Sequence, residues 1–110
     1  MVRTKARKDT NQDEIVDAIR AAGRSVAATH QLGAGFPDLC VGGPLETMCP
    51  RCKYAYHILY NWLCELKDGD KPPSKKILTP DEVEWHKNWK GQVAVVEDVD
   101  DALRLIGALW

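Results

Sequence analysis

The sequence predicts a single α/β domain in which helices flank a mixed sheet. Apolar residues recur at helical spacing in separate segments, and short runs rich in β-branched and aromatic residues lie between them. The length of 110 residues fits one domain, and the 45% hydrophobic and 28% charged fractions are ordinary for a globular protein. We therefore expect one domain over residues 1–110, with its elements in the order α-β-β-β-α-β-α.

The first half of the chain predicts one helix and two short strands. Asn11 is a preferred N-cap residue, and Glu14 follows three positions later, which is the spacing of a capping box. Gly23 is expected to end this helix. Residues 25–30 form a plausible strand, and Asp38 opens another strand after a turn rich in Gly and Pro.

The second half predicts a long strand, a helix, a strand and a final helix. Residues 57–67 are rich in Ile, Leu, Tyr and Trp, which favours the long strand. Thr79 is an N-cap residue followed by proline, and the helix that it starts is expected to run to about Lys90. Residues 92–96 predict the next strand, and Asp98 is expected to cap the final helix.

Charge and hydropathy narrow the class of protein. The net charge of −1 argues against binding of nucleic acid through charge alone. Basic residues nevertheless gather in residues 1–10, which we expect to be a flexible arm, and in a later loop. The loop residues Lys71, Lys75 and Lys76 are candidates for DNA phosphate contacts, although a solvated loop also explains them. No apolar run reaches the roughly 18 residues of a membrane span, and the basic N-terminus leads into no apolar segment, so we expect a cytoplasmic protein.

Three charged residues form the pattern most indicative of chemistry. Glu65 and Lys67 lie two positions apart in the long strand, so their side chains point to one face while Leu66 points to the other. Asp38 begins another strand, and pairing of the two strands would bring one carboxylate from each to the same place. Two carboxylates are oxygen ligands of the kind that Mg²⁺ prefers, and a metal-bound water can attack a phosphodiester. A lysine beside the metal can neutralise charge on the phosphate.

A purely structural interpretation of these residues stays open on spacing alone. Asp38 would close the turn after Pro37, while Glu65 and Lys67 would form the solvated face of an edge strand. The surrounding run 58–66 is strongly apolar, however, and a charged pair there is costly unless it is paired or bound to metal. The context therefore favours the metal site.

Four short motifs, in this order along the chain, resemble those of one nuclease family. They are Gly33-Ala34-Gly35-Phe36-Pro37-Asp38-Leu39, Glu65-Leu66-Lys67-Asp68-Gly69, Leu78-Thr79-Pro80 and Trp89-Lys90-Gly91. From about Asn11 to Leu109, the chain is similar to the VRR-NUC family of the PD-(D/E)XK nuclease superfamily. The resemblance is to the short, stand-alone members that bacteriophages carry.

This resemblance implies a restriction-endonuclease-like core and hydrolysis of DNA phosphodiester bonds with Mg²⁺ or Mn²⁺. It places Asp38 and Glu65 on the metal, with the Leu66 backbone carbonyl as a further ligand, and it makes Lys67 the catalytic lysine. Glu14 would sit at the edge of the site and hold a metal-bound water. The resemblance also implies a homodimer that cuts branched DNA, as a structure-specific enzyme of the Holliday-junction resolvase type does.

Two features depart from the family pattern. Glu82 stands in the helix after Thr-Pro, where the family commonly has Gln, and a second acid there would change the charge near the site. Residues 45–56 have no counterpart in compact members, and we expect this cysteine-containing insertion to be irregular. Its Cys49 and Cys52 form a CxxC pair, which is half of a tetrahedral zinc site.

The zinc interpretation has open alternatives. Further ligands would come from His57, Cys40, Cys64 or a second subunit, but free thiols or a redox role also fit the pair. Cys40 and Cys64 are themselves typical of small buried hydrophobic residues. His30, at the end of a predicted strand, is a candidate phosphate contact or an ordinary surface histidine.

Three functions are therefore set against one another. A metal-dependent endonuclease is favoured by the intact set of Asp38, Glu65 and Lys67. A non-catalytic DNA-binding or assembly module of the same fold is favoured by the net charge of −1 and by Glu82. A zinc-knuckle interaction protein would depend on the CxxC pair instead.

Overall fold

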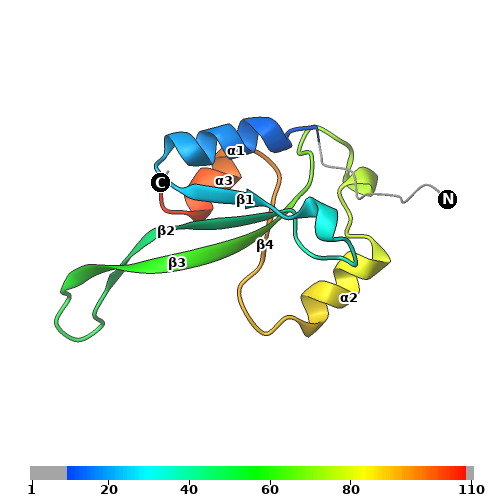
Figure 1. Cartoon of the computed structure of the whole chain (residues 1–110). Helices are drawn as coiled ribbons and strands as arrows, with labels where there is room; N and C mark the ends of the chain where they lie inside the picture. Colours follow the sequence, from blue (N-terminus) through cyan, green and yellow to red (C-terminus); the bar gives the residue numbers. More distant parts are fainter. Residues whose placement is uncertain (1–9, 109–110) are drawn as a thin grey trace.

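The computed structural model describes residues 10–108, so the basic arm predicted at residues 1–10 lies outside the described residues except for Thr10. The helices are α1 (Gln12–Ala21), α2 (Pro80–Asn88) and α3 (Val99–Leu105), with short 3-10 helices η1 (His30–Leu32) and η2 (Pro73–Lys75). The strands are β1 (Ser25–Ala28), β2 (Leu39–Met48), β3 (Ala55–Leu66) and β4 (Ala94–Val96). Apart from the two 3-10 helices, this is the predicted order (Figure 1).

The four strands form one mixed sheet in the order β1-β2-β3-β4. β2 pairs antiparallel with β1 and with β3, whereas β3 and β4 are parallel. α1 and α3 pack together on one side of the sheet, and α2 lies near the end where β2 begins and β3 ends (Figure 1). The predicted α/β class with a mixed sheet is confirmed. No helix among residues 10–108 is long and apolar enough to cross a membrane.

The hydrophobic core lies between α1, α3 and one face of the sheet. It is formed by the buried side chains of Ile15, Ile19, Leu39, Val41, Trp62, Cys64, Leu66, Val96, Ala102 and Ile106. The strand members alternate along β2 and β3, which is the period-two pattern of a sheet with one apolar face. Residues between them, Glu65 among them, therefore belong to the opposite face, which is the face that carries the candidate site.

The caps of the two longer helices differ from each other. The Asn11 side chain does not cap α1, and the predicted capping box with Glu14 is wrong at this end. Asn11 instead donates hydrogen bonds to the backbone carbonyls of Lys67 (3.3 Å) and Glu97 (2.9 Å), because it is buried against those segments. At α2, the capping box between Thr79 and Glu82 is present in full.

Residues 45–56 are not irregular, as the sequence had suggested. β2 and β3 pair continuously from Leu39 opposite Cys64 to Met48 opposite Ala55, so this stretch consists of the paired ends of two strands and the turn between them. The backbone groups that face the partner strand are paired within the hairpin. Proline is tolerated in β2 because the described part of β1 covers its outer edge only to Gly42. Whether the stretch is an insertion relative to the VRR-NUC family stays a prediction.

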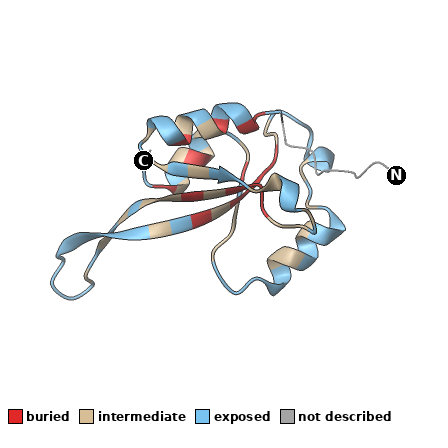
Figure 2. Cartoon of the chain, in the orientation of Figure 1, coloured by how far each residue is buried: buried red, intermediate tan, exposed pale blue. Residues whose placement is uncertain are grey.

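We call residues 43–60 the hairpin arm, because this part of the hairpin extends beyond both neighbouring strands. β1 reaches only to Gly42, and β4 begins its pairing at Cys64. The arm projects from the body, and its tip is exposed (Figures 1 and 2). Leu59 is 90% exposed and Tyr54 69% exposed, so the arm presents apolar side chains to solvent.

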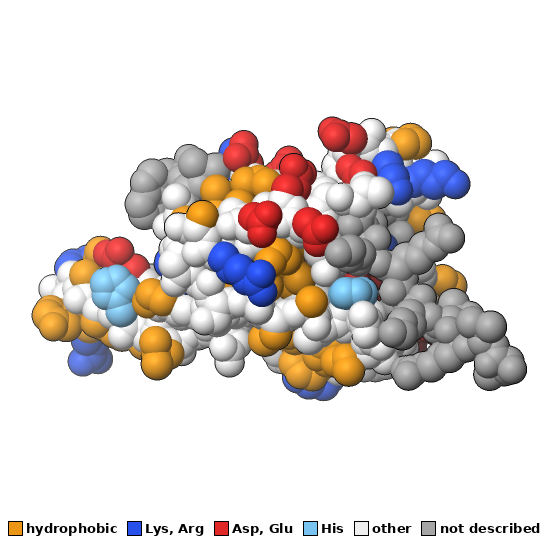
Figure 3. Space-filling view, turned by 45° about the horizontal axis from the view of Figure 1, so that its top comes forward, with side chains coloured by type: hydrophobic (Ala, Val, Ile, Leu, Met, Phe, Trp, Pro, Cys, Tyr) orange, Lys and Arg blue, Asp and Glu red, His pale blue; other side chains and the backbone are white. Residues whose placement is uncertain are grey.

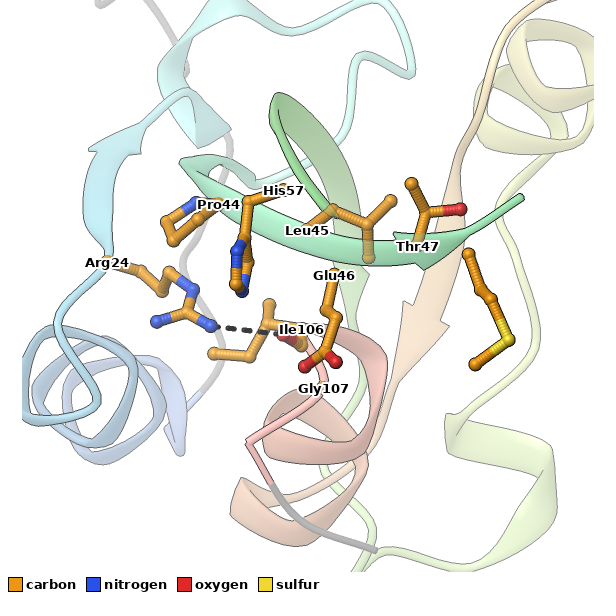
Figure 4. Close-up of a pocket in the computed structure, with 9 residues that line it drawn as sticks. Arg24, Pro44, Leu45, Glu46, Thr47, His57, Ile106 and Gly107 are labelled. Carbon is orange, nitrogen blue, oxygen red and sulfur yellow. Dashed lines mark hydrogen bonds between the residues drawn. The ribbon is translucent and has the colours of Figure 1, made fainter. Parts of the chain in front are cut away.

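A cavity of about 470 Å³ lies where the arm meets the body. It is lined by Arg24, Pro44, Leu45, Glu46, Thr47, Met48, His57, Ile106 and Gly107 (Figure 4). Arg24 donates a hydrogen bond of 3.4 Å from Nη2 to the Ile106 carbonyl, which ties the chain before β1 to the end of α3. The cavity is the largest of those described, yet it contains none of the predicted catalytic residues.

Candidate active site

Asp38 is fixed at the start of β2 by bonds to both neighbouring strands. Its backbone carbonyl accepts from the Thr29 N–H at 2.7 Å, and its own N–H donates to the Cys64 carbonyl at 3.0 Å. Its Oδ2 accepts from the Leu66 N–H at 2.8 Å. Because the register places Leu39 opposite Cys64, its continuation brings Asp38 beside Glu65, as the sequence predicted. The Asp38 residue is 8% exposed, so the carboxylate is shielded from solvent.

Glu65 is a buried acid that favours its protonated form. It is 1% exposed, and its Oε1 has no hydrogen-bond partner. Burial, followed by a hydrogen bond with Asp38 and the negative charges of Asp38 and Glu82, raises the pKa of Glu65 to about 10. In the metal-free protein, Glu65 is therefore neutral at neutral pH, and one proton is held between two carboxyl groups.

Lys67 forms an ion pair that the sequence did not predict. Its Nζ lies 2.8 Å from Glu82 Oε1, with the two side chains 11% and 17% exposed. The same Glu82 oxygen accepts from the Thr79 N–H at 2.8 Å, so the capping box of α2 holds the partner of Lys67. Burial alone would raise the pKa of Glu82, but hydrogen bonds from Lys67 and the Thr79 backbone lower it overall.

His86 is the second residue that α2 contributes to the site, and the sequence did not identify it as a site residue. Its Nε2 lies 3.6 Å from Glu65 Oε1 and, like that oxygen, has no hydrogen-bond partner. Glu82 and His86 are four residues apart and therefore share a face of the helix. That spacing, directly after the Thr79 cap, is the signal that would have identified both as residues facing the site.

The loop at residues 33–37 closes the site by packing on α2. Gly35 has φ +80°, and a Cβ built there would lie 2.3 Å from the Asp81 carbonyl oxygen. Phe36 packs edge-on against Trp85, with ring centroids 5.2 Å apart. The resulting pocket of about 370 Å³ is lined by His30, Gly33, Ala34, Gly35, Phe36, Asp38, Glu65, Lys67, Thr79, Asp81 and Glu82. The predicted triad thus shares one pocket with the start of α2.

Gly35→Ala is expected to lower the free energy of unfolding by roughly 2–4 kcal/mol. The added methyl group would collide with the α2 backbone, and alanine is strained in the left-handed conformation of this residue. Gly23→Ala is the matched control, since Gly23 has φ +83° but no atom lies within 4 Å of the position that a Cβ would occupy, and it should lose only about 1 kcal/mol. Chemical denaturation of both variants measures the difference. Equal losses would show that the loop does not depend on this close contact.

The donor set fits a divalent cation that takes oxygen ligands. Glu65 Oε1 is buried without a hydrogen-bond partner, and Asp38 lies beside it, so a cation there would replace the shared proton. Among residues 10–108, no group of three or more His, Cys, Asp or Glu side chains is arranged to hold a metal. Two carboxylates suit Mg²⁺, which keeps several of its waters. A ligand role for the Leu66 carbonyl stays a prediction.

The structure does not bring Glu14 to this pocket. Glu14 is exposed on α1 and lines a different hollow of about 290 Å³, together with acidic residues such as Asp68 and Glu97. Its expected role at the edge of the metal site therefore stays a prediction that the pocket lining does not support. The α1 side chain that contacts a pocket residue is buried Gln12, which lies 3.2 Å from the His30 ring. His30 lines the pocket, and its role as a phosphate contact stays a prediction.

The loop lysines and the cysteines lie apart from the pocket. Lys71 and Lys75 are exposed, whereas Lys76 pairs with Glu97 at 2.8 Å. Cys64 is in the core, and burial raises the pKa of its thiol to about 12. Cys49 and Cys52 are at the tip of the hairpin arm, and neither Cys40, Cys64 nor His57 joins them in a metal-binding group among the described residues.

A comparison with solved structures supports the fold. One similar chain is a VRR_NUC domain, with 23% sequence identity and a TM-score of 0.52 over 90% of this chain and 92% of that chain. No family model matches the sequence. No curated protein matches it either. At this identity the likeness establishes the fold alone, and the chain has the restriction-endonuclease-like α/β fold of that domain.

Proposed function

We propose that this protein is a metal-dependent endonuclease that hydrolyses DNA phosphodiester bonds. The observation that carries the proposal is the convergence of Asp38, Glu65 and Lys67, buried in one pocket at the adjoining ends of β2 and β3. A fold needs no such group for stability, because burying three ionisable side chains is costly. Perturbed, buried acids in a pocket are typical of a catalytic site.

Asp38 and Glu65 would hold Mg²⁺ or Mn²⁺, which supplies positive charge and an activated water to the phosphate when it is bound. Asp38 is held in place by the Leu66 N–H, so its carboxylate needs little reorganisation. Lys67 is paired with Glu82, which holds the ammonium group in position at the pocket. When DNA is bound, the ammonium group can turn toward a phosphate oxygen and stabilise the negative charge that develops there.

Branched DNA is the substrate that we propose first, and a homodimer is the form that we expect to cut it. Both proposals come from the resemblance of the sequence to the stand-alone VRR-NUC members. The exposed Lys71 and Lys75, together with His30 at the pocket, are the candidate phosphate contacts. Acidic side chains gather over the helical face (Figure 3), which leaves that face unsuited to DNA.

The test is cleavage of a labelled four-way junction beside linear duplex, flap and single-stranded DNA, in Mg²⁺ and in Mn²⁺. We expect metal-dependent cuts, placed symmetrically on the junction, and at least about a 100-fold lower rate for Lys67→Ala. The variant loses the ammonium group but keeps both carboxylates. Its fold is checked by circular dichroism, because removal of Lys67 leaves Glu82 without its ion-pair partner.

A non-catalytic DNA-binding module of the same fold is the second candidate. The ion pair between Lys67 and Glu82 favours it, because the lysine charge is already engaged in the metal-free protein. DNA binding by folded protein without cleavage of any substrate in either metal would support this module. Nicking of single strands only would leave the nuclease proposal standing and exclude the junction as substrate.

A further inference from the structure

The tip of the hairpin arm has the backbone geometry of a metal-binding knuckle. Cys49 and Cys52 flank a tight turn, in which the Lys53 N–H donates to the Cys49 carbonyl at 3.0 Å and the Cys49 N–H donates to the Tyr54 carbonyl at 2.9 Å. Lys53 has φ +63°, a left-handed conformation that a non-glycine residue rarely adopts. The turn therefore holds both cysteines at a fixed place despite its exposure.

The two cysteine side chains lie together on the turn. The Cys49 sulfur forms hydrogen bonds with the backbone N–H groups of Cys52 and Arg51 and with the Cys52 side chain. Both sulfur atoms of the pair are therefore close enough to be ligands of one metal ion, whereas Cys64 is buried in the core.

One chain supplies only half of a zinc site. Structural zinc takes four ligands in a tetrahedron, and two thiolates from one tight turn are a common half. Among residues 10–108, no third His, Cys, Asp or Glu side chain joins the pair. Another molecule could supply the remaining ligands, because the projecting tip is accessible to one (Figure 2).

We propose that the arm tip is a zinc half-site, which Cys49 and Cys52 of a second copy of this chain complete. Two copies related by a two-fold axis supply four sulfur ligands through identical contacts. A zinc ion with four thiolates has a net charge of −2, and Arg51 and Lys53 beside the cysteines provide compensating positive charge from both copies.

The surroundings of the cysteines favour a second copy for a further reason. Tyr54 and Tyr56 are exposed and stacked, with ring centroids 6.3 Å apart. An interface between two tips would cover these apolar side chains, which a lone tip leaves in water. The site is separate from the active-site pocket, so this inference goes beyond the proposed nuclease function and does not depend on it.

The experiment uses the full chain purified under reducing conditions without chelator, with zinc measured by elemental analysis and assemblies weighed by native mass spectrometry. We expect one zinc ion per two chains and a dimer that carries that single ion. Replacement of zinc by Co²⁺ should give the thiolate-to-cobalt absorption of a site with four sulfur ligands. Cys49→Ser and Cys52→Ser should each lose the ion, whereas Cys40→Ala, which removes a half-buried thiol in the sheet, should retain it.

Three results would overturn the proposal. One zinc ion per chain would mean that ligands other than a second tip complete the site. Zinc that persists in folded Cys49→Ser would belong elsewhere, such as at Asp38 and Glu65. Absence of zinc from the wild-type protein, with no uptake of added Zn²⁺ or Co²⁺, would leave the cysteines as free thiols. None of these readouts requires DNA cleavage, so the nuclease proposal is judged separately.

Discussion

Glu65→Gln is expected to abolish DNA cleavage while the protein stays folded. The amide has nearly the same shape as the neutral carboxyl group that the metal-free protein buries at this position, so packing is preserved. It cannot become the anionic ligand that a divalent cation requires, and we expect cleavage to fall at least about 100-fold. Glu84→Gln, a substitution of an exposed acid on α2, is the matched control and should cut as the wild type does.

The same variant also tests the protonation of Glu65 through stability. The pKa of Glu65 is raised from 4.5 to about 10, so between these values the folded protein holds a proton that the unfolded chain has lost. The contribution of this proton to the free energy of unfolding is complete below the pKa of the unfolded chain. It is lost as pH rises through the pKa of the folded protein, by up to about 1.4 kcal/mol for each pH unit. Glutamine does not titrate. The stability of Glu65→Gln relative to wild type should therefore increase with pH.

Urea unfolding in the presence of chelator, at about pH 5.5, 7 and 8.5, measures this trend. The comparison between the two proteins removes the contributions of other titrating groups, because those are shared. A difference that does not change with pH would show that Glu65 is ionised in the folded protein. The assignment of a shared proton to the carboxyl pair would then be wrong.

Asp38→Asn and Asp38→Ala are both expected to lose at least about 100-fold in cleavage, but only the alanine variant should be strongly destabilised. The asparagine side-chain oxygen can still accept the Leu66 N–H, whereas alanine leaves that buried donor without a partner. An unpaired buried N–H costs about 1–3 kcal/mol. Asp38 would thus combine a structural task with a metal-binding one, and the pair of variants separates them.

Thermal or chemical denaturation of the metal-free proteins provides the stability measurement, and the labelled-DNA assay provides the rate. Equal stability of the two variants would mean that the Leu66 N–H finds another acceptor. If Asp38→Asn retained cleavage, Asp38 would not be a required metal ligand, because the amide that replaces the carboxylate is neutral.

Strand periodicity predicted that Glu65 and Lys67 share a face, and the further assumption that their strand pairs with the one that Asp38 begins brought Asp38 beside them. Charged residues two apart in an apolar strand must share a face, and the buried alternation of β3 confirms that Glu65 faces away from the core that contains Leu66. The order of elements followed from the same local patterns. These features depend on the chain near each residue, which is why the sequence alone could indicate them.

The contribution of α2 and the path of α1 depend on tertiary packing. Glu82 stands three residues after the Thr79 N-cap, a spacing that explains it as a capping residue, and nothing local showed that the same carboxylate also meets Lys67. His86 meets Glu65 only because α2 packs against the end of β3. Glu14 was assigned to the site by the resemblance, but the orientation of α1 directs it to another hollow.

The length of the hairpin arm can change without moving the catalytic residues, so the arm acts as a spacer. The positions of Asp38 and Glu65 are set by the pairs next to Leu39 and Cys64, whereas the arm pairs only with itself. Each matched pair of residues added to the arm would lengthen it by about 3.4 Å, and pairs added in twos would preserve the face that the tip presents. If two tips share zinc, the arm length fixes the distance between two catalytic centres. Variation in this one segment would then change the spacing of paired cuts without any change in chemistry.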